Sequence, residues 1–362
     1  MNVDIRKLLN RFASFHFIVD GTGQAIMNVH SNQLSWPTFT KLTLVLIFIG
    51  SLNAQANTFF PEEIPTLSNQ THTQVTVEET TLTVTFGPIS LPAHHKGLLA
   101  ATLPLHTFEI PKDLMVTGWK PAVFTSDGTL LPKKYLHHMV FLELEKPNFA
   151  CPGEPYYFAA SGQEMLDVSL PEGYGIELKK GAKIMTAVAF YHEVPPTKNV
   201  MASFTMKLSP NNNRLQPLQA YYIGVSFMCY SDFSGYEGSQ TDEGILLPPG
   251  LQVHSKRFTF KMEGCVKFAY PHGHDHMTLL ALDNTTTAQT QLRTVPHMGP
   301  SGTFLDFPLD QIYSDQTGFE INTQDTYEIT MVYHRALQNH NPTYGMGSYA
   351  LYAVPGSCEV HS

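Results

Sequence analysis

The stretch YEITMVY, at residues 327–333, alternates apolar with polar or β-branched side chains and is rich in aromatic residues. This two-residue period is typical of a β-strand with one buried face. Residues 82–86 and 258–262 show the same alternation, and 25 Gly and 25 Pro are spread between such segments as turn formers. No long stretch places apolar residues at helical spacing. The sequence therefore predicts an all-β protein built of antiparallel β-sandwiches.

The chain has 362 residues, enough for two domains of ordinary size, and 43% of them are hydrophobic, enough for two buried cores. The best candidate boundary is a polar, glycine-rich segment, SDFSGYEGSQTDEG at residues 231–244, followed by LLPPG at 246–250. We therefore expect two tandem jelly-roll-like sandwiches, an N-terminal one at residues 57–240 and a C-terminal one at 241–362.

The N-terminus has the pattern of a targeting segment. Lys41 precedes an apolar run at residues 42–49, and Ala54 and Ala56 form a small-x-small cleavage pattern. The run is too short for a comfortable membrane span. We expect residues 1–56 to be a leader and signal peptide, so that the mature protein is secreted, periplasmic or extracellular, with no stable membrane span after signal cleavage. An uncleaved N-terminal anchor is the alternative.

Cysteine content and charge narrow the class further. Cys151, Cys229, Cys265 and Cys358 form no Cys-x-x-Cys pair, and an even number of cysteines in an exported protein favours disulfides. Three pairings are possible. With two domains, Cys151–Cys229 and Cys265–Cys358 is the pairing that keeps each bridge within one domain. The net charge of −9 and the lack of a basic patch argue against nucleic acid as a partner.

Histidines supply the strongest hint of function. The run PHGHDH carries His272, His274 and His276 at two-residue spacing, just before an apolar segment. Side chains at i and i+2 of a strand share one face, so two such imidazoles form half of a metal site. Pro271 and Gly273 favour a turn, which predicts that His274 and His276 lie in the strand itself. A surface histidine-rich loop is the alternative.

Three more histidines are candidate ligands. His137 and His138 are neighbours in the run YLHHMVF. Neighbouring residues of a regular strand point to opposite faces, so a twist, a bulge or the use of different ring nitrogens must bring both to one metal ion. One core histidine and one surface histidine is the alternative. His192 ends the apolar strand MTAVAFY, a position where a lone histidine is usually structural.

A methionine and two carboxylates complete the candidates. Met346 lies between two glycines, which hint at exposure. Zinc and copper both accept histidine, and a thioether ligand favours copper because soft sulfur suits Cu(I). Glu193 and Asp275 are candidate hydrogen-bond partners for ligand histidines.

Taken in chain order, these features resemble the copper type II, ascorbate-dependent monooxygenases, the family of peptidylglycine α-hydroxylating monooxygenase, dopamine β-hydroxylase and their bacterial relatives. The resemblance runs over residues 82–358. The segments that carry it are MVTGWKPAVFTSDGTLLPKKYLHHMVF, LPEGYGIELKKGAKIMTAVAFYHE, LLPPGLQVHSKRFTF, FAYPHGHDHMTLLAL and YGMGSYALYAV.

The resemblance implies two β-sandwich domains with one copper ion on each, a Cys265–Cys358 disulfide, and hydroxylation of a C–H bond with O₂ and ascorbate or a similar reductant. It implies no acid or base side chain in catalysis. The implied copper ligands are His137, His138 and His192 in the first domain and His274, His276 and Met346 in the second, with His272 as an alternative to His276.

The chain also departs from the family pattern. In the amidating enzyme an arginine that holds the substrate carboxylate precedes the His-x-His pair by two positions, where this chain has His272. Residues 347–350 do not reproduce the contacts that follow the family methionine. The substrate, a small molecule or a peptide, is therefore open. The alternative functions are a non-catalytic secreted copper-binding or chaperone protein and a metal-free adhesive β-sandwich protein.

Overall fold

The computed structural model describes residues 72–91, 99–102, 106–148, 155–164, 167–191, 194–210, 214–225, 240–241, 244–337 and 343–358, together with two N-terminal strands. The chain divides into two compact units, Met1–Thr66 and Leu67–Ser362. In the first unit, β1 (Phe17–Val19) pairs antiparallel with β2 (Ala25–Met27). The predicted signal segment at residues 42–56 lies outside the described residues. Within the described part of the chain, no helix is long and apolar enough to cross a membrane.

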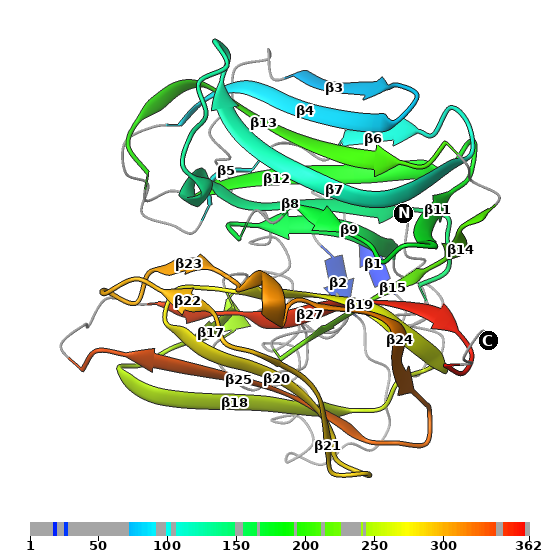
Figure 1. Cartoon of the computed structure of the whole chain (residues 1–362). Helices are drawn as coiled ribbons and strands as arrows, with labels where there is room; N and C mark the ends of the chain where they lie inside the picture. Colours follow the sequence, from blue (N-terminus) through cyan, green and yellow to red (C-terminus); the bar gives the residue numbers. More distant parts are fainter. Residues whose placement is uncertain are drawn as a thin grey trace. The chain divides into compact units, whose positions relative to one another are not determined.

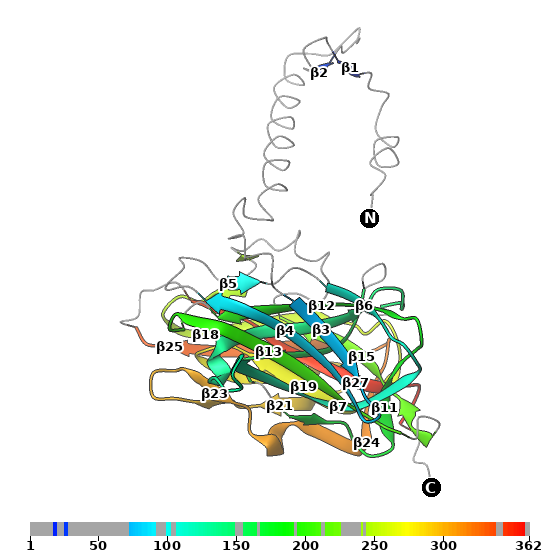
Figure 2. The same cartoon turned by 90° about the horizontal axis from the view of Figure 1, so that it is seen from above.

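The second unit is all-β, as predicted, and begins with a pair of sheets that we call the first sandwich (Figure 1). One sheet has the order β14 (Gln216–Pro217), β11 (Tyr174–Leu178), β7 (Leu114–Thr125), β13 (Thr197–Leu208), β4 (Thr81–Leu91) and β3 (His72–Val77), with β10 (Val168–Ser169) also on β7. Figure 2 shows β3, β4, β13 and β7 following one another across this sheet. The other sheet has the order β5 (Leu99–Thr102), β12 (Lys183–Tyr191), β8 (Leu136–Glu143) and β9 (Tyr156–Gly162), with β6 (His106–Glu109) on β12. The 3₁₀ turn η1 (Lys133–Tyr135) leads into β8.

The second sandwich contains the other two large sheets. One has the order β15 (Gln219–Gly224), β27 (Gly347–Pro355), β19 (Gly264–Gly273) and β24 (Tyr313–Ile321). The other has the order β18 (Gly250–Phe258), β25 (Tyr327–Arg335), β20 (Met277–Asn284) and β21 (Gln289–Thr294). Smaller elements are β16 (Gln240–Thr241), β17 (Gly244–Leu246), β26 (Tyr344–Gly345), β22 (His297–Met298), β23 (Phe304–Asp306) and the 3₁₀ turn η4 (Leu309–Gln311). Among the described strands, every pair is antiparallel except β11 with β14.

Two features of the sequence correspond directly to the sheets. The YEITMVY stretch forms β25, and its Tyr327, Ile329, Met331 and Tyr333 are buried in strict alternation. The chain passes between sandwiches at Leu218, because β15 pairs with β27 along its whole length. This change of sandwich precedes the boundary expected at residues 240/241.

Strand β27 separates two hydrophobic cores. Tyr349 and Leu351 belong to the core of the second sandwich, whereas Ala350 and Tyr352 belong to the core of the first. A strand with successive side chains on opposite faces produces this alternation when both faces are covered. The sheet that contains β27 therefore has one face on each core, and the two sandwiches pack directly on each other.

Strand β19 follows the same pattern beside β27. Phe268 and Tyr270 join the first core, and Ala269 joins the second. The indole of Trp119, on β7, lies 6.3 Å from the ring of Tyr270 and 5.7 Å from that of Tyr352, measured between centroids. Aromatic contacts thus extend from the first core across the boundary between the sandwiches.

A disulfide joins Cys265, near the start of β19, to Cys358, just after β27, with 4.9 Å between the two Cα atoms. The pairing that the family resemblance implied for these two cysteines is confirmed. Cys151 and Cys229 lie outside the described residues.

Candidate metal centre

The face of β19 that packs on the first sandwich also carries histidine. Residues two apart on a strand share a face, so His272 follows Phe268 and Tyr270 toward the first sandwich. His272 pairs across the ladder with Ser348, and the last pair is Gly273 with Gly347. Beyond this pair, β19 continues into His274 and β27 is preceded by Met346. His272, His274 and Met346 thus lie together where β19 ends and β27 begins, and we call them the second-sandwich site.

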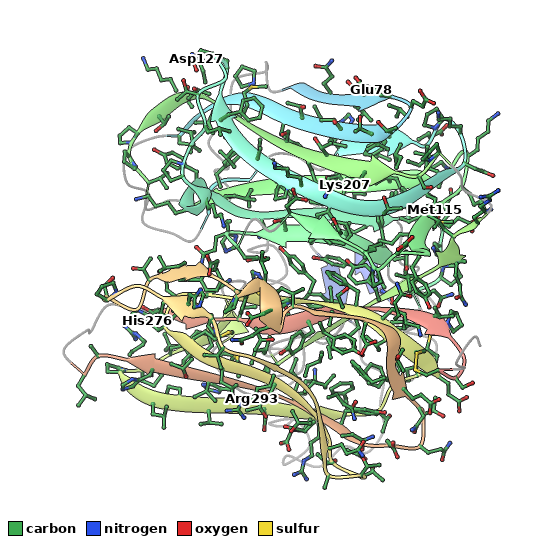
Figure 3. The ribbon with its side chains drawn as sticks, viewed as in Figure 1. Glu78, Met115, Asp127, Lys207, His276 and Arg293 are labelled. Atoms are coloured by element: carbon green, nitrogen blue, oxygen red, sulfur yellow. A yellow bond between two sulfur atoms is a disulfide. The ribbon has the colours of Figure 1, made fainter. Side chains whose placement is uncertain are left out.

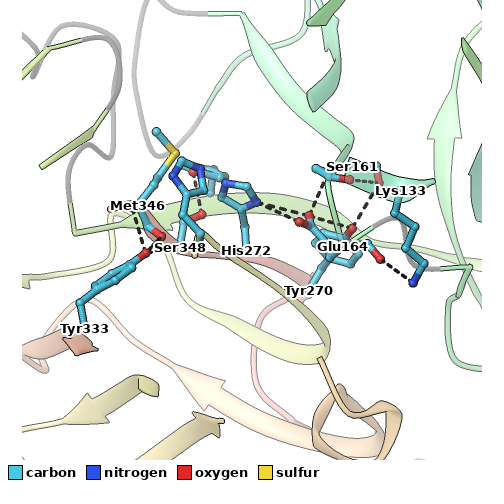
Figure 4. Close-up of polar contacts among 11 residues, drawn as sticks. Lys133, Ser161, Glu164, Tyr270, His272, Tyr333, Met346 and Ser348 are labelled. Atoms are coloured by element: carbon cyan, nitrogen blue, oxygen red, sulfur yellow. Dashed lines mark hydrogen bonds and ion pairs between the residues drawn. The ribbon is translucent and has the colours of Figure 1, made fainter. Parts of the chain in front are cut away.

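The hydroxyl of Tyr333, from β25, holds two of these residues together. It accepts the backbone N–H of Met346 at 3.0 Å and that of His274 at 3.3 Å, and it donates to the carbonyl oxygen of Met346 at 2.7 Å. Tyr333 is fully buried, and it holds both backbones against the second core. Figure 4 shows Tyr333 directly beneath Met346.

The glycines that flank Met346 have a packing role. Gly345 and Gly347 are buried, whereas the sequence pattern hinted at exposure. A Cβ atom on Gly347 would lie 2.8 Å from the Cβ of Met331, and one on Gly345 would lie 2.9 Å from the ring of Tyr333. The missing side chains let the strand approach the second core closely, and Met346 itself is half-buried.

The two imidazoles of the second-sandwich site are in edge-to-face contact, with 5.2 Å between the ring centroids of His272 and His274. His274 is only 5% exposed, and burial lowers its pKa to about 3, so the ring is neutral at pH 7. Its Nδ1 lies 3.4 Å from the carbonyl oxygen of Tyr344. A carbonyl oxygen accepts a hydrogen bond, so Nδ1 carries the hydrogen and the lone pair is on Nε2. This is the form in which histidine binds a metal ion.

A β-bulge brings the first-sandwich histidines together. In the ladder between β8 and β12, His138 pairs with Ala189 and Leu136 with Phe190, so the register shifts at His137. A bulge inserts one residue and re-aims its side chain. The ring centroids of His137 and His138 consequently lie 4.7 Å apart, although the residues are neighbours. Of the routes that the sequence left open, a twist, a bulge or different ring nitrogens, the structure has a bulge.

The two histidine groups face each other across the boundary between the sandwiches. The ring centroids of His137 and His274 are 5.7 Å apart. Burial lowers the pKa of His138 to about 4, so this imidazole is also neutral at pH 7. Four imidazoles, His137, His138, His272 and His274, thus form a continuous set with members on both sandwiches.

His276 does not belong to this set. Strand β19 ends at Gly273 and β20 begins at Met277, so His274 and His276 lie in the intervening turn and not on one strand face. His276 has a left-handed backbone, with φ of 72°, and its backbone N–H donates to the carbonyl oxygen of Gly302 at 2.7 Å. Its ring lies so close to Gly302 that a Cβ there would be 2.2 Å from Nδ1. The label in Figure 3 places His276 in the second sandwich, near the end where β22 and β23 lie.

The remaining predicted site residues have other positions. Pro271, for which the sequence predicts a turn, is part of β19. It lies beyond Ala269, the last residue of β19 that pairs with β24. At Pro271 only β27 pairs with β19, so proline is tolerated there. The carboxylate of Asp275 accepts the backbone N–H of Phe304 at 2.7 Å. His192 and Glu193 lie outside the described residues.

Sequence reasoning missed Glu164, which follows β9. Its side chain is fully buried, and one carboxylate oxygen, Oε1, accepts the backbone N–H of Gly162 at 2.8 Å and the hydroxyl of Tyr270 at 3.1 Å. Both carboxylate oxygens lie 3.3 Å from Nδ1 of His272. Burial by itself raises the pKa of Glu164, but the contacts with His272 and Gly162 outweigh it and lower the pKa below its ordinary value. The short polar segment SGQE had no spacing that marked this glutamate.

The donor types suit copper. Within the described residues, no three His, Cys, Asp or Glu side chains are grouped as a metal site. Each sandwich nevertheless offers two imidazoles. The third predicted donor is the imidazole of His192 in the first sandwich and the thioether of Met346 in the second. Imidazole accepts both oxidation states of copper, and a thioether favours Cu(I). The residues present therefore fit the metal that the motif order implied.

No protein-family model matches this sequence, and a search of curated proteins found no match either. Interpretation of the site therefore depends on its donor atoms and their arrangement.

Proposed function

We propose that this protein is an exported copper-dependent monooxygenase that hydroxylates a C–H bond with O₂ and ascorbate or a similar reductant. One copper ion is held by His137, His138 and His192, and the other by the second-sandwich site, His272, His274 and Met346. The observation that carries the proposal is the arrival of two pairs of imidazoles and a half-buried methionine from both sandwiches at one boundary.

When bound, copper supplies one-electron chemistry and activation of O₂. The chain supplies ligands in the correct protonation state, because burial keeps His138 and His274 neutral. The thioether of Met346, which is half-buried, would favour the reduced metal ion. Tyr333 fixes the backbones of His274 and Met346, so that these two donors keep their relative position.

Two further observations support the proposal. The order of the motifs along the chain resembles that of the ascorbate-dependent copper monooxygenases. The Cys265–Cys358 disulfide is compatible with an exported protein, since such bridges persist in oxidising compartments.

The proposal is tested on the full chain, purified without a histidine tag. We expect two copper ions per chain, and, after anaerobic reduction with ascorbate, O₂ uptake coupled to ¹⁸O incorporation into a member of a panel of small molecules and peptides. The change Met346→Ala should abolish product formation while the circular dichroism spectrum stays unchanged. Met201→Ala, which removes a half-buried thioether from the first sandwich, is the matched control and should keep full activity.

Three outcomes contradict the proposal. Full activity of Met346→Ala would remove the methionine from the site. Copper binding without coupled O₂ uptake would instead indicate a copper-binding or chaperone protein. Absence of any copper affinity on titration would indicate a metal-free adhesive protein.

A further inference from the structure

Glu164 is the residue that the proposed metal chemistry leaves unexplained. It belongs to the first sandwich, yet its carboxylate contacts two residues of the second, Tyr270 and His272. A fully buried carboxylate is strongly unfavourable unless it is paired and hydrogen-bonded. Because Glu164 is nevertheless buried at the boundary between the sandwiches, we expect its carboxylate to have a function there.

The local structure is shaped around this carboxylate. Gly162 pairs with His138 in the ladder between β8 and β9, and its backbone N–H binds Glu164. A Cβ on Gly162 would lie 2.6 Å from Oε2 of Glu164 and 2.9 Å from Cε1 of His272. A side chain at position 162 would thus displace both groups. Glycine leaves the space in which the carboxylate of one sandwich meets the imidazole of the other.

The contact also determines which nitrogen of His272 would be free to bind a metal ion. The carboxylate of Glu164 already accepts the N–H of Gly162 and the hydroxyl of Tyr270, so Nδ1 of His272 is the donor in its contact with the same carboxylate. The lone pair is then on Nε2, the ring nitrogen that does not contact Glu164. In the view of Figure 4, the imidazole of His272 lies between Glu164 and the side chain of Met346. Carboxylate–histidine pairs of this kind orient ligands and raise their basicity.

We propose that Glu164 of the first sandwich is a positioning residue for the metal ion of the second, acting through His272. This inference rests on the proposed copper function. The second-sandwich site is complete only when the first sandwich is packed against it, because its ligand His272 takes its orientation from a carboxylate on the other sandwich. The negative charge also favours Cu(II) over Cu(I) at this site and opposes the effect of the Met346 thioether.

The first test needs no metal. Ring ¹⁵N chemical shifts of His272 in the metal-free full chain should show hydrogen on Nδ1 and a lone pair on Nε2. In Glu164→Gln the amide can donate to Nδ1, so the opposite tautomer should become populated. A wild-type ring with its hydrogen on Nε2 would overturn the inference.

The second test measures copper affinity by competition with a chelator, and the electron paramagnetic resonance spectrum of the Cu(II) form. Glu164→Gln should weaken Cu(II) binding at one of the two sites about 10–100-fold and change the spectrum of that site. It should weaken Cu(I) binding less. Each factor of ten by which the loss of Cu(II) affinity exceeds the loss of Cu(I) affinity raises the reduction potential of the site by about 59 mV for a one-electron couple.

Two variants separate positioning from general structural damage. Glu143→Gln changes another buried glutamate of the first sandwich, one that contacts Lys146 at 3.8 Å, and it should leave both copper sites unchanged. Tyr270→Phe removes one donor to Glu164 but keeps its contact with His272, so it should have a smaller effect than Glu164→Gln.

The outcomes distinguish this inference from the proposed function. If the wild-type chain binds no copper, the proposed function fails. If it binds two copper ions and Glu164→Gln binds both with unchanged affinity and spectrum, the function stands and the positioning role of Glu164 is wrong. An equal loss in Glu143→Gln would also overturn it, because the effect would then be general.

Discussion

The two histidine groups are built in different ways. In the first sandwich, His137 and His138 come from one strand, and a single bulge in β8 brings their rings to 4.7 Å. In the second, His272 comes from β19, His274 from the turn that follows it, Met346 precedes β27, and Tyr333 reaches in from β25. The first group is set by a local irregularity of the backbone, whereas the second requires three strands and a carboxylate from the other sandwich.

This difference has a consequence for sensitivity to change. Damage to the packing of the second sandwich should affect the second-sandwich site and leave the pair on β8 in place. Damage to the first sandwich should affect both groups, because Glu164 extends the second-sandwich site into the first sandwich.

Ligand removal should have the largest effect and would test whether the two groups are separate. His272→Ala and His137→Ala should each lower the copper content from two ions per chain to one, because each removes an imidazole from a different set. Metal analysis after dialysis measures this. Loss of both ions on either substitution would show that the four imidazoles, with 5.7 Å between the rings of His137 and His274, form one shared centre.

Loss of the disulfide should have the second-largest effect. The bridge closes a loop of 93 residues that contains β19, β20 and β25, so Cys265→Ser with Cys358→Ser should lower the free energy of unfolding by about 2–5 kcal/mol. Chemical denaturation gives this value. Hydrogen exchange should accelerate in β19 and β27 more than in β8, and equal acceleration in all three strands would contradict the contrast between the two groups.

Removing the hydroxyl that holds His274 and Met346 should have an intermediate effect. Tyr333→Phe leaves the buried backbone N–H of His274 and the part-buried one of Met346 without this acceptor, which should cost about 1–3 kcal/mol of unfolding free energy. Copper should bind less tightly at the second-sandwich site and unchanged on β8.

Tyr327→Phe is the matched control for this substitution. Tyr327 is buried on the same strand, and its hydroxyl accepts the backbone N–H of Asn322 at 3.2 Å, at the far end of β25. It should lower stability without changing copper affinity. If both variants weaken copper binding equally, Tyr333 has no specific role at the site.

The smallest effect is expected at His276. The change His276→Asn keeps a residue that tolerates the left-handed backbone, so the unfolding free energy should change by less than about 0.5 kcal/mol. Copper content should stay at two ions. A loss of one ion would restore His276 as a ligand in place of His272.

Much of the fold could be predicted from local patterns. The alternation in residues 327–333 identified a half-buried strand, and β25 has that burial pattern. The adjacent His137 and His138 required a twist, a bulge or different ring nitrogens to share a metal ion, and the register of β8 shows a bulge there. Other features depend on partners distant in sequence. Pro271 and Gly273 have the composition of a turn, but pairing with Tyr349 and Gly347 keeps them in β19.

The sequence by itself determined the all-β class and the residue types at the candidate centre, because these follow from side-chain period and donor chemistry. The tertiary structure decided that the ring of His272 lies beside that of His274, that the chain changes sandwich at Leu218, and that Glu164 contacts His272 of the other sandwich. Each of these depends on ladder register or on the packing of one sandwich against the other. Such contacts join residues tens to hundreds of positions apart, and no local pattern encodes them.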